Sequence, residues 1–268
     1  MTQLRDQTIK NNFLFAATMM QGNNCKDLLE MILGIEIDHL RVNNEQQLMF
    51  NPDYHGIRLD VYARDENNTR YDIEIQIAYD YLPKRCRYYH SQMDMELLSV
   101  GDDYENLPDT YVIFICDFDP VGDKKYIYTI TNTIIESGNI KFEDGSHTIL
   151  LSTKGTNDDE VSKEIKTFLK YVSSSRRECE DNFNDEYVAR LQKTVREIWQ
   201  SREMEVQYMT FEDMLRREGK KEYSRGYGMA LIDIYKRCID SGMSKDEAVK
   251  ITGITEVELA SIECPEAD

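Results

Sequence analysis

The sequence predicts an α/β domain followed by an all-helical region, and three patterns carry this prediction. Residues 57–64 and 71–77 alternate apolar and polar side chains with the period of two that is typical of half-buried strands. Residues 110–118 form a continuous β-branched and aromatic run, which fits a fully buried strand. From residue 186 onward, apolar side chains recur at helical spacing within a highly charged stretch.

Composition favours a globular protein that stays in the cytoplasm. The chain has 268 residues, 41% of them hydrophobic, which is enough for one large domain or a medium domain with an appendage. No apolar run approaches the roughly 20 residues that span a bilayer, so we expect no membrane partner. The N-terminal decapeptide MTQLRDQTIK lacks a hydrophobic signal segment.

Net charge argues against a general affinity for nucleic acid. The formal net charge is −18 at pH 7, whereas a protein that neutralises phosphates normally presents a basic surface. The charge is uneven, however, and leaves room for a local basic groove. Basic residues cluster at Lys84, Arg85, Arg87 and His90, at Arg176 and Arg177, and at Arg216 and Arg217.

The first 35 residues are expected to be helical, with a break near Gly22. Lys10–Asn12 precede the first apolar stripe, and we interpret them as solvated residues at a helix end. Residues 39–50 follow as an opening strand, and residues 51–53 as a turn.

The two alternating segments predict a hairpin whose register decides whether two acids meet. A three-residue loop of Glu66–Asn68 pairs Asp60 with Glu74, whereas a two-residue turn pairs Asp60 with Ile75 and mixes the two faces. Asn68 tolerates the left-handed conformation that the longer loop requires at its last position. We therefore expect Asp60 and Glu74 side by side, with Cβ atoms roughly 5 Å apart.

Two facing carboxylates are destabilising unless a cation neutralises them, and this favours a metal site. Carboxylates suit Mg²⁺, which keeps several waters and binds few protein oxygens; Mn²⁺ could replace it. In this interpretation Asp60 and Glu74 are ligands together with the backbone carbonyl of Ile75. Gln76, on the same strand face, would orient an attacking water or a phosphate oxygen. The alternative is an exposed hairpin face with incidental charges.

A basic, aromatic helix should follow over residues 84–98. Its apolar side chains recur at helical spacing, and the opposite face carries Arg85 and Tyr88. Strands at residues 125–131 and 147–152 and a helix at residues 161–171 complete the domain. We interpret the acids directly after the buried strand, Asp117 and Asp119, as turn and capping residues rather than ligands.

The C-terminal region, residues 176–268, is predicted to be entirely helical, after a first domain of residues 1–175. Helices are expected at residues 186–217 and 220–240, and a capping box of Ser244 and Glu247 should start a short one. That last segment and the residues after it resemble a helix-turn-helix. The would-be recognition helix carries glutamates and no arginine, so we favour packing or self-association over DNA contact.

The order of these segments resembles the PD-(D/E)XK nuclease superfamily, and more narrowly its branch of nuclease family transposases, which is related to recombination-promoting nucleases. Asp60 and the run IEIQ (Ile73 to Gln76) carry the core motif. The similarity extends through RLDVYARD, KRCRYYHSQMD, YVIFICDFDP and TILLSTKG, and thus over most of residues 10–155.

The resemblance implies a restriction-endonuclease-like central mixed sheet flanked by helices, and Mg²⁺-dependent cleavage of DNA in recombination or transposition. Asp60 and Glu74 match the metal-binding carboxylates of the motif. Gln76 stands where the motif has lysine, so a fixed positive charge is missing. Stabilisation of the transition state would therefore depend more on the metal. Asn12 lies nearest to the place where many superfamily members carry a further acid.

The resemblance also implies DNA contacts and leaves one alternative open. Lys84, Arg85 and Tyr88 fall where the helix after the hairpin can face a phosphate. A homodimer through the helical C-terminal region fits an enzyme that cuts both strands. The alternative, which the net charge and Gln76 favour, is a catalytically degenerate relative that binds or assembles through its helical tail.

Overall fold

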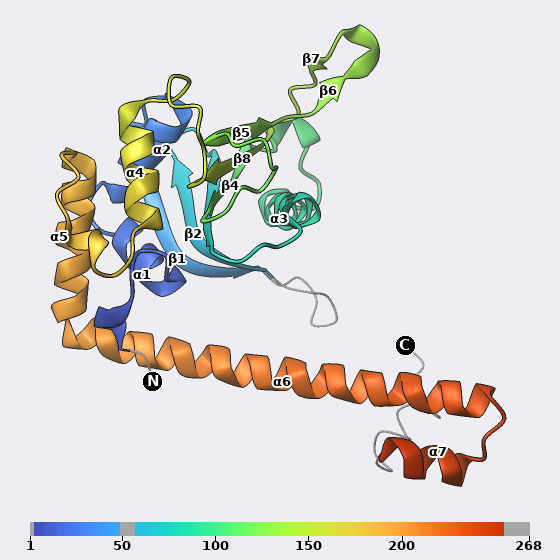
Figure 1. Cartoon of the computed structure of the whole chain (residues 1–268). Coiled ribbons are helices and arrows are strands. Elements are labelled where there is room, and N and C mark those ends of the chain that lie inside the picture. The colour runs from blue at the N-terminus through green and yellow to red at the C-terminus, as the bar shows by residue number, and fades with distance from the viewer. Residues whose placement is uncertain (1–2, 49–56, 255–268) are drawn as a thin grey trace. The chain divides into compact units, whose positions relative to one another are not determined.

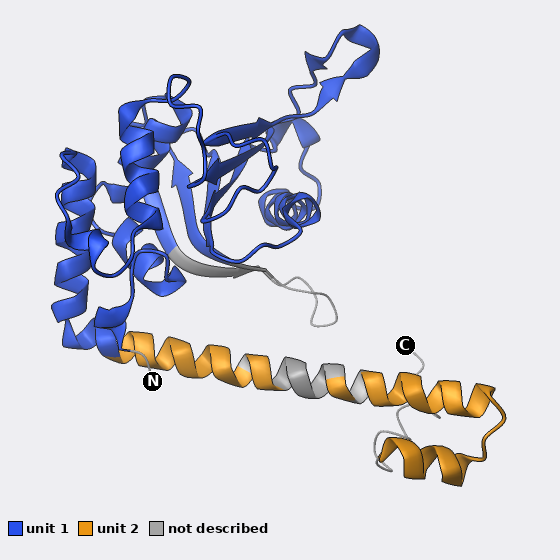
Figure 2. Cartoon of the chain, viewed as in Figure 1, with its two compact units in different colours: residues 1–205 blue, residues 206–268 orange. Residues whose placement is uncertain are grey.

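The structure is a computed structural model that describes residues 3–48 and 57–254. It divides into two compact units, residues 1–205 and 206–268 (Figure 2). The residues that the sequence predicts to bind metal (Asp60, Glu74 and Ile75) or DNA (Lys84, Arg85 and Tyr88) all lie in the first unit.

A six-stranded mixed sheet forms the centre of the first unit (Figure 1). In spatial order its strands are β1 (Leu40–Leu48), β2 (Ile57–Asp65), β3 (Arg70–Gln76), β4 (Thr110–Cys116), β8 (Ser146–Ser152) and β5 (Ile127–Ile130). The first three are antiparallel neighbours, β3, β4 and β8 are parallel, and β5 runs antiparallel at the edge. The predicted α/β class with a mixed central sheet is confirmed.

Helices cover both faces of this sheet (Figure 1). On one face α3 (Leu82–Leu97) packs over a cluster that includes Val112 and Phe114. A larger cluster, which includes Ile73 and Ile113, lies on the other face. It is covered by α1 (Asn12–Met19), α2 (Asn24–Leu33), α4 (Lys163–Ser173) and α5 (Glu186–Gln200). Because successive strand residues point to opposite faces, the continuous apolar run of β4 serves both clusters.

The β2–β3 hairpin has the predicted register. Val61 pairs with Ile73, and the same register continued by one step sets Asp60 opposite Glu74, although the strand pairing itself ends at Val61 and Ile73. Asn68 ends the connecting loop with a φ of 69°, the left-handed conformation that the three-residue loop requires. The sequence argument from loop length is therefore confirmed.

The N-terminal segment is less helical than predicted. A 3-10 turn at Leu4–Asp6 precedes α1, and Gly34 ends α2 with a φ of 66°. Asn11 caps α1 by accepting a hydrogen bond from the Leu14 N–H at 3.1 Å. The turn predicted at residues 51–53 lies outside the described residues.

A small ribbon between β5 and β8 was not predicted from the sequence. Its strands are β6 (Thr133–Ile134) and β7 (Ile140–Lys141), and Figure 1 shows the ribbon projecting from the sheet. Gly138 and Asn139 make the turn with φ values of 75° and 63°. Two-residue strands are too short to produce an alternating pattern.

The break between the last long helices falls earlier than predicted. A single helix over residues 186–217 was expected, but α5 ends at Gln200 and α6 (Arg202–Asp240) begins after Ser201. The Ser201 hydroxyl accepts a hydrogen bond from the Met204 N–H at 3.3 Å, as an N-cap does. The first compact unit extends past residue 175 to residue 205, because α5 packs against α1, α2 and α4.

The second unit contains most of α6 and the short helix α7 (Lys245–Thr252) (Figure 2). Tyr235 and Ala248 form a buried cluster with Ile254. The predicted capping box is confirmed, since the Ser244 N–H donates to Glu247 Oε2 at 3.1 Å. The second half of the predicted helix-turn-helix lies outside the described residues.

Within residues 3–48 and 57–254, we find no helix with the length and apolar content that crossing a membrane requires.

Candidate active site

The candidate site forms where β2 separates from β3. The paired residues end at Val61 and Ile73, and beyond them side chains replace the backbone ladder. The Asp60 N–H donates to Glu74 Oε1 at 3.1 Å, and the Ile75 N–H donates to Asp60 Oδ2 at 3.5 Å. Each carboxylate is thus bound by the backbone of the opposite strand. Both are buried, with exposed fractions of 4% for Asp60 and 2% for Glu74.

The backbone of Ile75 faces the same space as the two carboxylates. In a strand, the N–H and C=O of one residue point to the same side, so the Ile75 carbonyl is directed toward β2 as its N–H is. The carbonyl of Gln76 points the other way and accepts from the Asp117 N–H at 2.9 Å. The predicted oxygen donors of Asp60, Glu74 and Ile75 therefore face one space.

Helix α1 contributes an amide to this site. Asn12 Nδ2 donates to Asp60 Oδ2 at 2.8 Å, which fixes the orientation of that carboxylate. The interpretation of Lys10 and Asn12 as solvated helix-end residues was wrong, because Lys10 Nζ also binds Asp117 Oδ2, at 3.0 Å. Both contacts join positions far apart in the chain, and the sequence offers no local pattern for them.

Helix α3 places Arg85 against the carboxylate of Glu74. Arg85 Nη2 donates to Glu74 Oε2 at 2.9 Å, and the Tyr89 hydroxyl accepts from Arg85 Nε and Nη2 at 3.0 and 2.8 Å. Burial by itself lowers the pKa of Arg85, but Tyr89, Glu74 and Asp80 together raise it above the ordinary value. Arg85 is therefore a fixed cation inside the site.

The side-chain amide of Gln76 is bound at both ends. Its Oε1 accepts from Arg85 Nη1 at 2.8 Å, and its Nε2 donates to the carbonyl of Ala78 at 2.7 Å. The contact with Ala78 fixes which end of the amide faces Arg85. Gln76 thus holds the guanidinium beside Glu74.

Lys84 and Tyr88, the other residues expected to contact DNA, lie in different surroundings on α3. Lys84 is exposed, with Nζ 5.8 Å from the centroid of the Tyr81 ring. Tyr88 is half-buried and packs against the cluster beneath α3. Their contact with DNA remains a prediction.

His90 does not contribute charge to the basic cluster in which the sequence placed it. Its ring nitrogens lie 2.9 Å from Thr110 Oγ1 and 3.0 Å from Thr148 Oγ1, in a buried position. Burial, followed by the proximity of His147, lowers the pKa of His90 to about 4. The imidazole is therefore neutral near pH 7.

Asp72 is a buried acid to which sequence reasoning assigned no role. It lies on the same face of β3 as Glu74, two residues away, and is fully buried. Among the described residues, neither of its carboxylate oxygens has a hydrogen-bond donor. Burial, followed by the charges of Glu74 and Asp60, raises the pKa of Asp72 well above its ordinary value. The signal in the sequence is the run DIEIQ, which sets three polar side chains on one face of a core strand.

The donor set of Asp60, Glu74 and the Ile75 carbonyl consists entirely of oxygen. Oxygen donors suit a hard cation such as Mg²⁺, which needs only one or two carboxylates because it keeps several waters. No cluster of three or more His, Cys, Asp or Glu side chains suited to a metal occurs in the described part of the chain. A cation here would therefore rely on the two carboxylates, the backbone and water.

Comparison with known proteins gives one match. A family model described as PD-(D/E)XK nuclease family transposase matches residues 13–223, which include Asp60, Glu74, Gln76 and Arg85. The mixed sheet flanked by helices is consistent with that fold. Searches of the curated proteins and of the solved structures found no match.

Proposed function

The chain belongs to the PD-(D/E)XK nuclease family transposases, and on this premise we propose that it is a metal-dependent DNA endonuclease. It hydrolyses phosphodiester bonds in recombination or transposition. The observation that supports this function best is the convergence of Asp60 and Glu74, each bound to the backbone of the opposite strand where β2 leaves β3.

Asp60, Glu74 and the Ile75 carbonyl are the residues that would hold Mg²⁺. When bound, the ion would supply Lewis acidity, which would polarise a phosphoryl oxygen and lower the pKa of an attacking water. Asn12 keeps Asp60 oriented through its 2.8 Å hydrogen bond. The burial of both carboxylates excludes bulk water and strengthens their attraction for a cation.

Arg85 supplies the positive charge that the family motif carries as lysine at the position of Gln76. Its guanidinium contacts both Glu74 and Gln76, and the side chain is 26% exposed, so it remains open to a phosphate. A planar guanidinium suits a phosphoryl oxygen on which negative charge accumulates. Gln76, which is also expected to orient water, acts as a positioning residue for Arg85.

Lys84 and Tyr88 contact the DNA backbone beside the site. They lie four residues apart on α3, and therefore on one side of that helix. The protein acts as a homodimer through its C-terminal helices, because cleavage of both strands requires two sites.

Plasmid cleavage tests the proposed function. Wild type, Asp60→Asn and Glu74→Gln would be incubated with supercoiled plasmid and Mg²⁺, beside Glu197→Gln, which removes an exposed carboxylate on α5. Wild type and the control should nick the plasmid, and both site variants should lose on the order of 100-fold or more in rate. Absence of cleavage by wild type with Mg²⁺ and Mn²⁺, or equal cleavage by both site variants, would contradict the nuclease function.

A binding or assembly module without catalysis is the second candidate. The ion pair of Arg85 with Glu74 favours it, because one oxygen of a metal ligand is already engaged. Thermal unfolding separates the candidates, since a cation that binds the native state raises the Tm. The nuclease function predicts that Mg²⁺ or Mn²⁺ raises the Tm of wild type but not of Asp60→Asn. Unchanged Tm values for both proteins would favour the binding module.

A further inference from the structure

A row of lysines lies on α4, outside the site described above. Lys163, Lys166 and Lys170 follow one another at spacings of three and four residues, so they share one side of the helix. Lys163 and Lys170 are exposed and Lys166 is half-buried. The other side of α4 packs into the core through Ile165, Phe168, Leu169 and Val172. The lysines are therefore not required to build the core.

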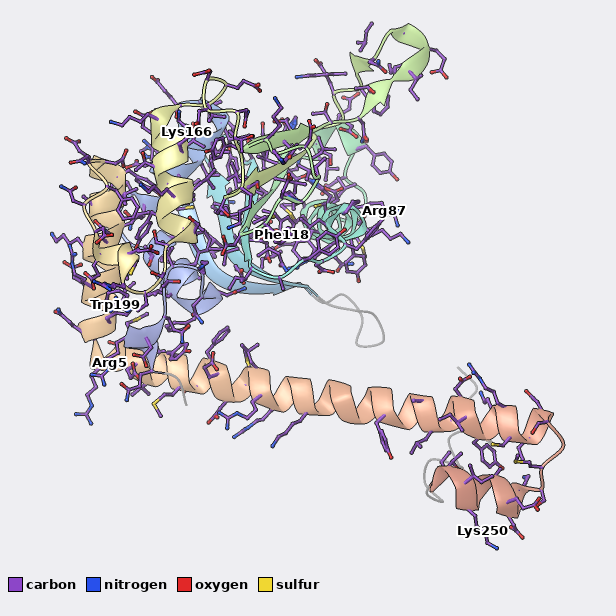
Figure 3. All side chains as sticks on the ribbon, viewed as in Figure 1. Arg5, Arg87, Phe118, Lys166, Trp199 and Lys250 are labelled. Atoms are coloured by element: carbon purple, nitrogen blue, oxygen red, sulfur yellow. The ribbon has the colours of Figure 1, made fainter. Side chains whose placement is uncertain are left out.

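The three lysines line a shallow hollow of about 390 Å³. Thr153, at the end of β8, and Ser173, at the end of α4, also line it. Figure 3 shows Lys166 on α4, on the side of the sheet opposite to Arg87 of α3.

This hollow is connected to the candidate site through Asp117. Lys10 Nζ lies 3.0 Å from Asp117 Oδ2 and 3.5 Å from the carbonyl of Ser173, which lines the hollow. The Asp117 N–H donates to the carbonyl of Gln76 at 2.9 Å. Asp117 thus lies between the strand that carries Glu74 and the lysines of α4.

Lys154 extends the positive charge at the same place. Its Nζ donates to Asp117 Oδ1 at 3.0 Å, and the Thr153 hydroxyl donates to the same oxygen at 2.8 Å. Lys154 remains half-exposed, with 51% of its side chain open to solvent. Because Asp117 faces both Lys10 and Lys154, these contacts leave a net positive charge.

Asp158, which also lines the hollow, does not cancel the positive charge of the lysines. The carboxylate of Asp158 accepts from the Tyr126 hydroxyl at 3.0 Å, while Lys166 Nζ donates to the main-chain carbonyl of Asp158 at 2.7 Å. Glu164 lies beside Lys163 and Glu178 near Lys170, so with Asp117 and Asp158 four carboxylates stand against five lysines, on a chain whose net charge is −18.

We propose that these five residues, which we call the lysine row, bind the sugar–phosphate backbone of the DNA that the candidate site cleaves. The lysine row consists of Lys10, Lys154, Lys163, Lys166 and Lys170. Lysine ammonium groups are point charges that suit phosphates and give affinity without sequence preference. The eight residues from Lys163 to Lys170 cover about 10 Å of helix, roughly the rise of three nucleotides. The choice of DNA as the ligand rests on the proposed nuclease function.

DNA binding in the absence of divalent metal tests the lysine row without cleavage. Fluorescence anisotropy with a labelled duplex in EDTA would compare wild type with the triple variant Lys163→Ala, Lys166→Ala and Lys170→Ala. The matched control is the triple variant Lys26→Ala, Lys141→Ala and Lys193→Ala, which removes the same charge from α2, β7 and α5.

The lysine row variant should bind at least about tenfold more weakly at low salt, and the control should bind as wild type does. The slope of log K against log salt concentration should become less steep by about 2 to 3, because three phosphate contacts are lost. Equal affinity of the lysine row variant and wild type would overturn the proposal, as would failure of wild type to bind.

The plasmid assay distinguishes failure of the lysine row from failure of the nuclease. If wild type binds DNA through the lysine row but never cleaves it, the proposed role of the lysine row is supported and the nuclease function is contradicted. If wild type cleaves DNA and the lysine row variant binds and cleaves it equally well, the nuclease function is supported and the proposed role of the lysine row is contradicted. Equal Tm values for wild type and the variant would show that lost binding is not lost folding.

Discussion

Helices α3 and α4 flank the sheet on opposite faces and use their cations differently (Figure 3). On α3, Arg85 is bound to Glu74 and Gln76, and His90 is buried and neutral. On α4, Lys163 and Lys170 are exposed to solvent. Arg85 of α3 neutralises the protein's own carboxylate, whereas Lys163 and Lys170 of α4 direct their charge to solvent. Basic residues that are alike in the sequence thus differ in whether their charge is available to a ligand.

The two faces of β3 explain this difference. Under α3 the strand presents Asp72, Glu74 and Gln76, so a buried cation is needed there. The face toward α4 presents Ile73 and Ile75, which require only apolar contacts. The alternation of one strand therefore decides which helix must supply an internal charge.

The largest expected effect comes from Arg85→Ala, which removes the internal charge of α3. Glu74 would remain buried without its cation, so the free energy of unfolding should fall by about 3–5 kcal/mol. Urea unfolding measures this change. Arg85→Lys should restore part of the stability, because lysine keeps the positive charge but lacks the planar guanidinium that contacts both Glu74 and Gln76. A loss below about 1 kcal/mol for Arg85→Ala would show that the ion pair does not stabilise the face under α3.

The next largest effect is a dependence of the free energy of unfolding on pH, which His90 causes. Its folded pKa of about 4 lies below the ordinary value, so between the two values the unfolded chain binds the extra proton. The contribution of His90 to stability is complete above about pH 6.5 and is lost as the pH falls toward 4. The loss is on the order of 3 kcal/mol.

Unfolding of wild type and His90→Gln at several pH values measures this contribution. Glutamine can still bond the two threonine hydroxyls but does not titrate. The stability difference between the two proteins should shrink as the pH falls below about 6.5. A difference that stays constant between pH 7.5 and pH 4.5 would contradict the neutral, buried state of His90.

A smaller effect, of opposite sign, is expected for Asp72→Asn. Asparagine does not ionise, and its amide can donate to a neighbouring carboxylate, so the free energy of unfolding at pH 8 should rise by about 1–3 kcal/mol. Because the folded pKa of Asp72 is raised, its cost in wild type grows as the pH rises above the unfolded value. The gain from the variant should therefore be larger at pH 8 than at pH 5. A variant less stable than wild type at pH 8 would mean that the Asp72 carboxyl is needed for folding.

The smallest effect on stability is expected on α4. The triple variant Lys163→Ala, Lys166→Ala and Lys170→Ala should change the free energy of unfolding by less than about 0.5 kcal/mol, because exposed charges contribute little. Urea unfolding beside Arg85→Ala makes the contrast between the two helices direct. A loss above about 2 kcal/mol would assign these lysines a structural role.

The parts of the fold that the sequence predicts correctly depend on local patterns. Alternation and loop length were enough for the register that sets Asp60 opposite Glu74, because a slip of one residue would have mixed both faces. The β6–β7 ribbon and the break at Ser201 were not predicted. A ribbon of two-residue strands has no measurable period, and the helical pattern continues on both sides of Ser201.

The candidate site likewise combines contacts that the sequence predicts with contacts that only the structure reveals. The two carboxylates lie on one hairpin, so their proximity follows from pairing neighbours in the chain. The contacts of Asn12 with Asp60 and of Lys10 with Asp117 join distant segments, and only packing reveals them. The sequence singled out Arg85 for its charge, but its binding to Glu74 depends on how α3 lies across the sheet.

Titration of Mn²⁺ followed by electron paramagnetic resonance tests the central claim, that Asp60 and Glu74 together form a cation site. Wild type should bind Mn²⁺, and Mg²⁺ should compete for the same site. Asp60→Asn and Glu74→Gln should each lose this binding, while the lysine row variant keeps it. Unchanged Mn²⁺ affinity in both carboxylate variants would contradict the cation site and the nuclease mechanism that depends on it.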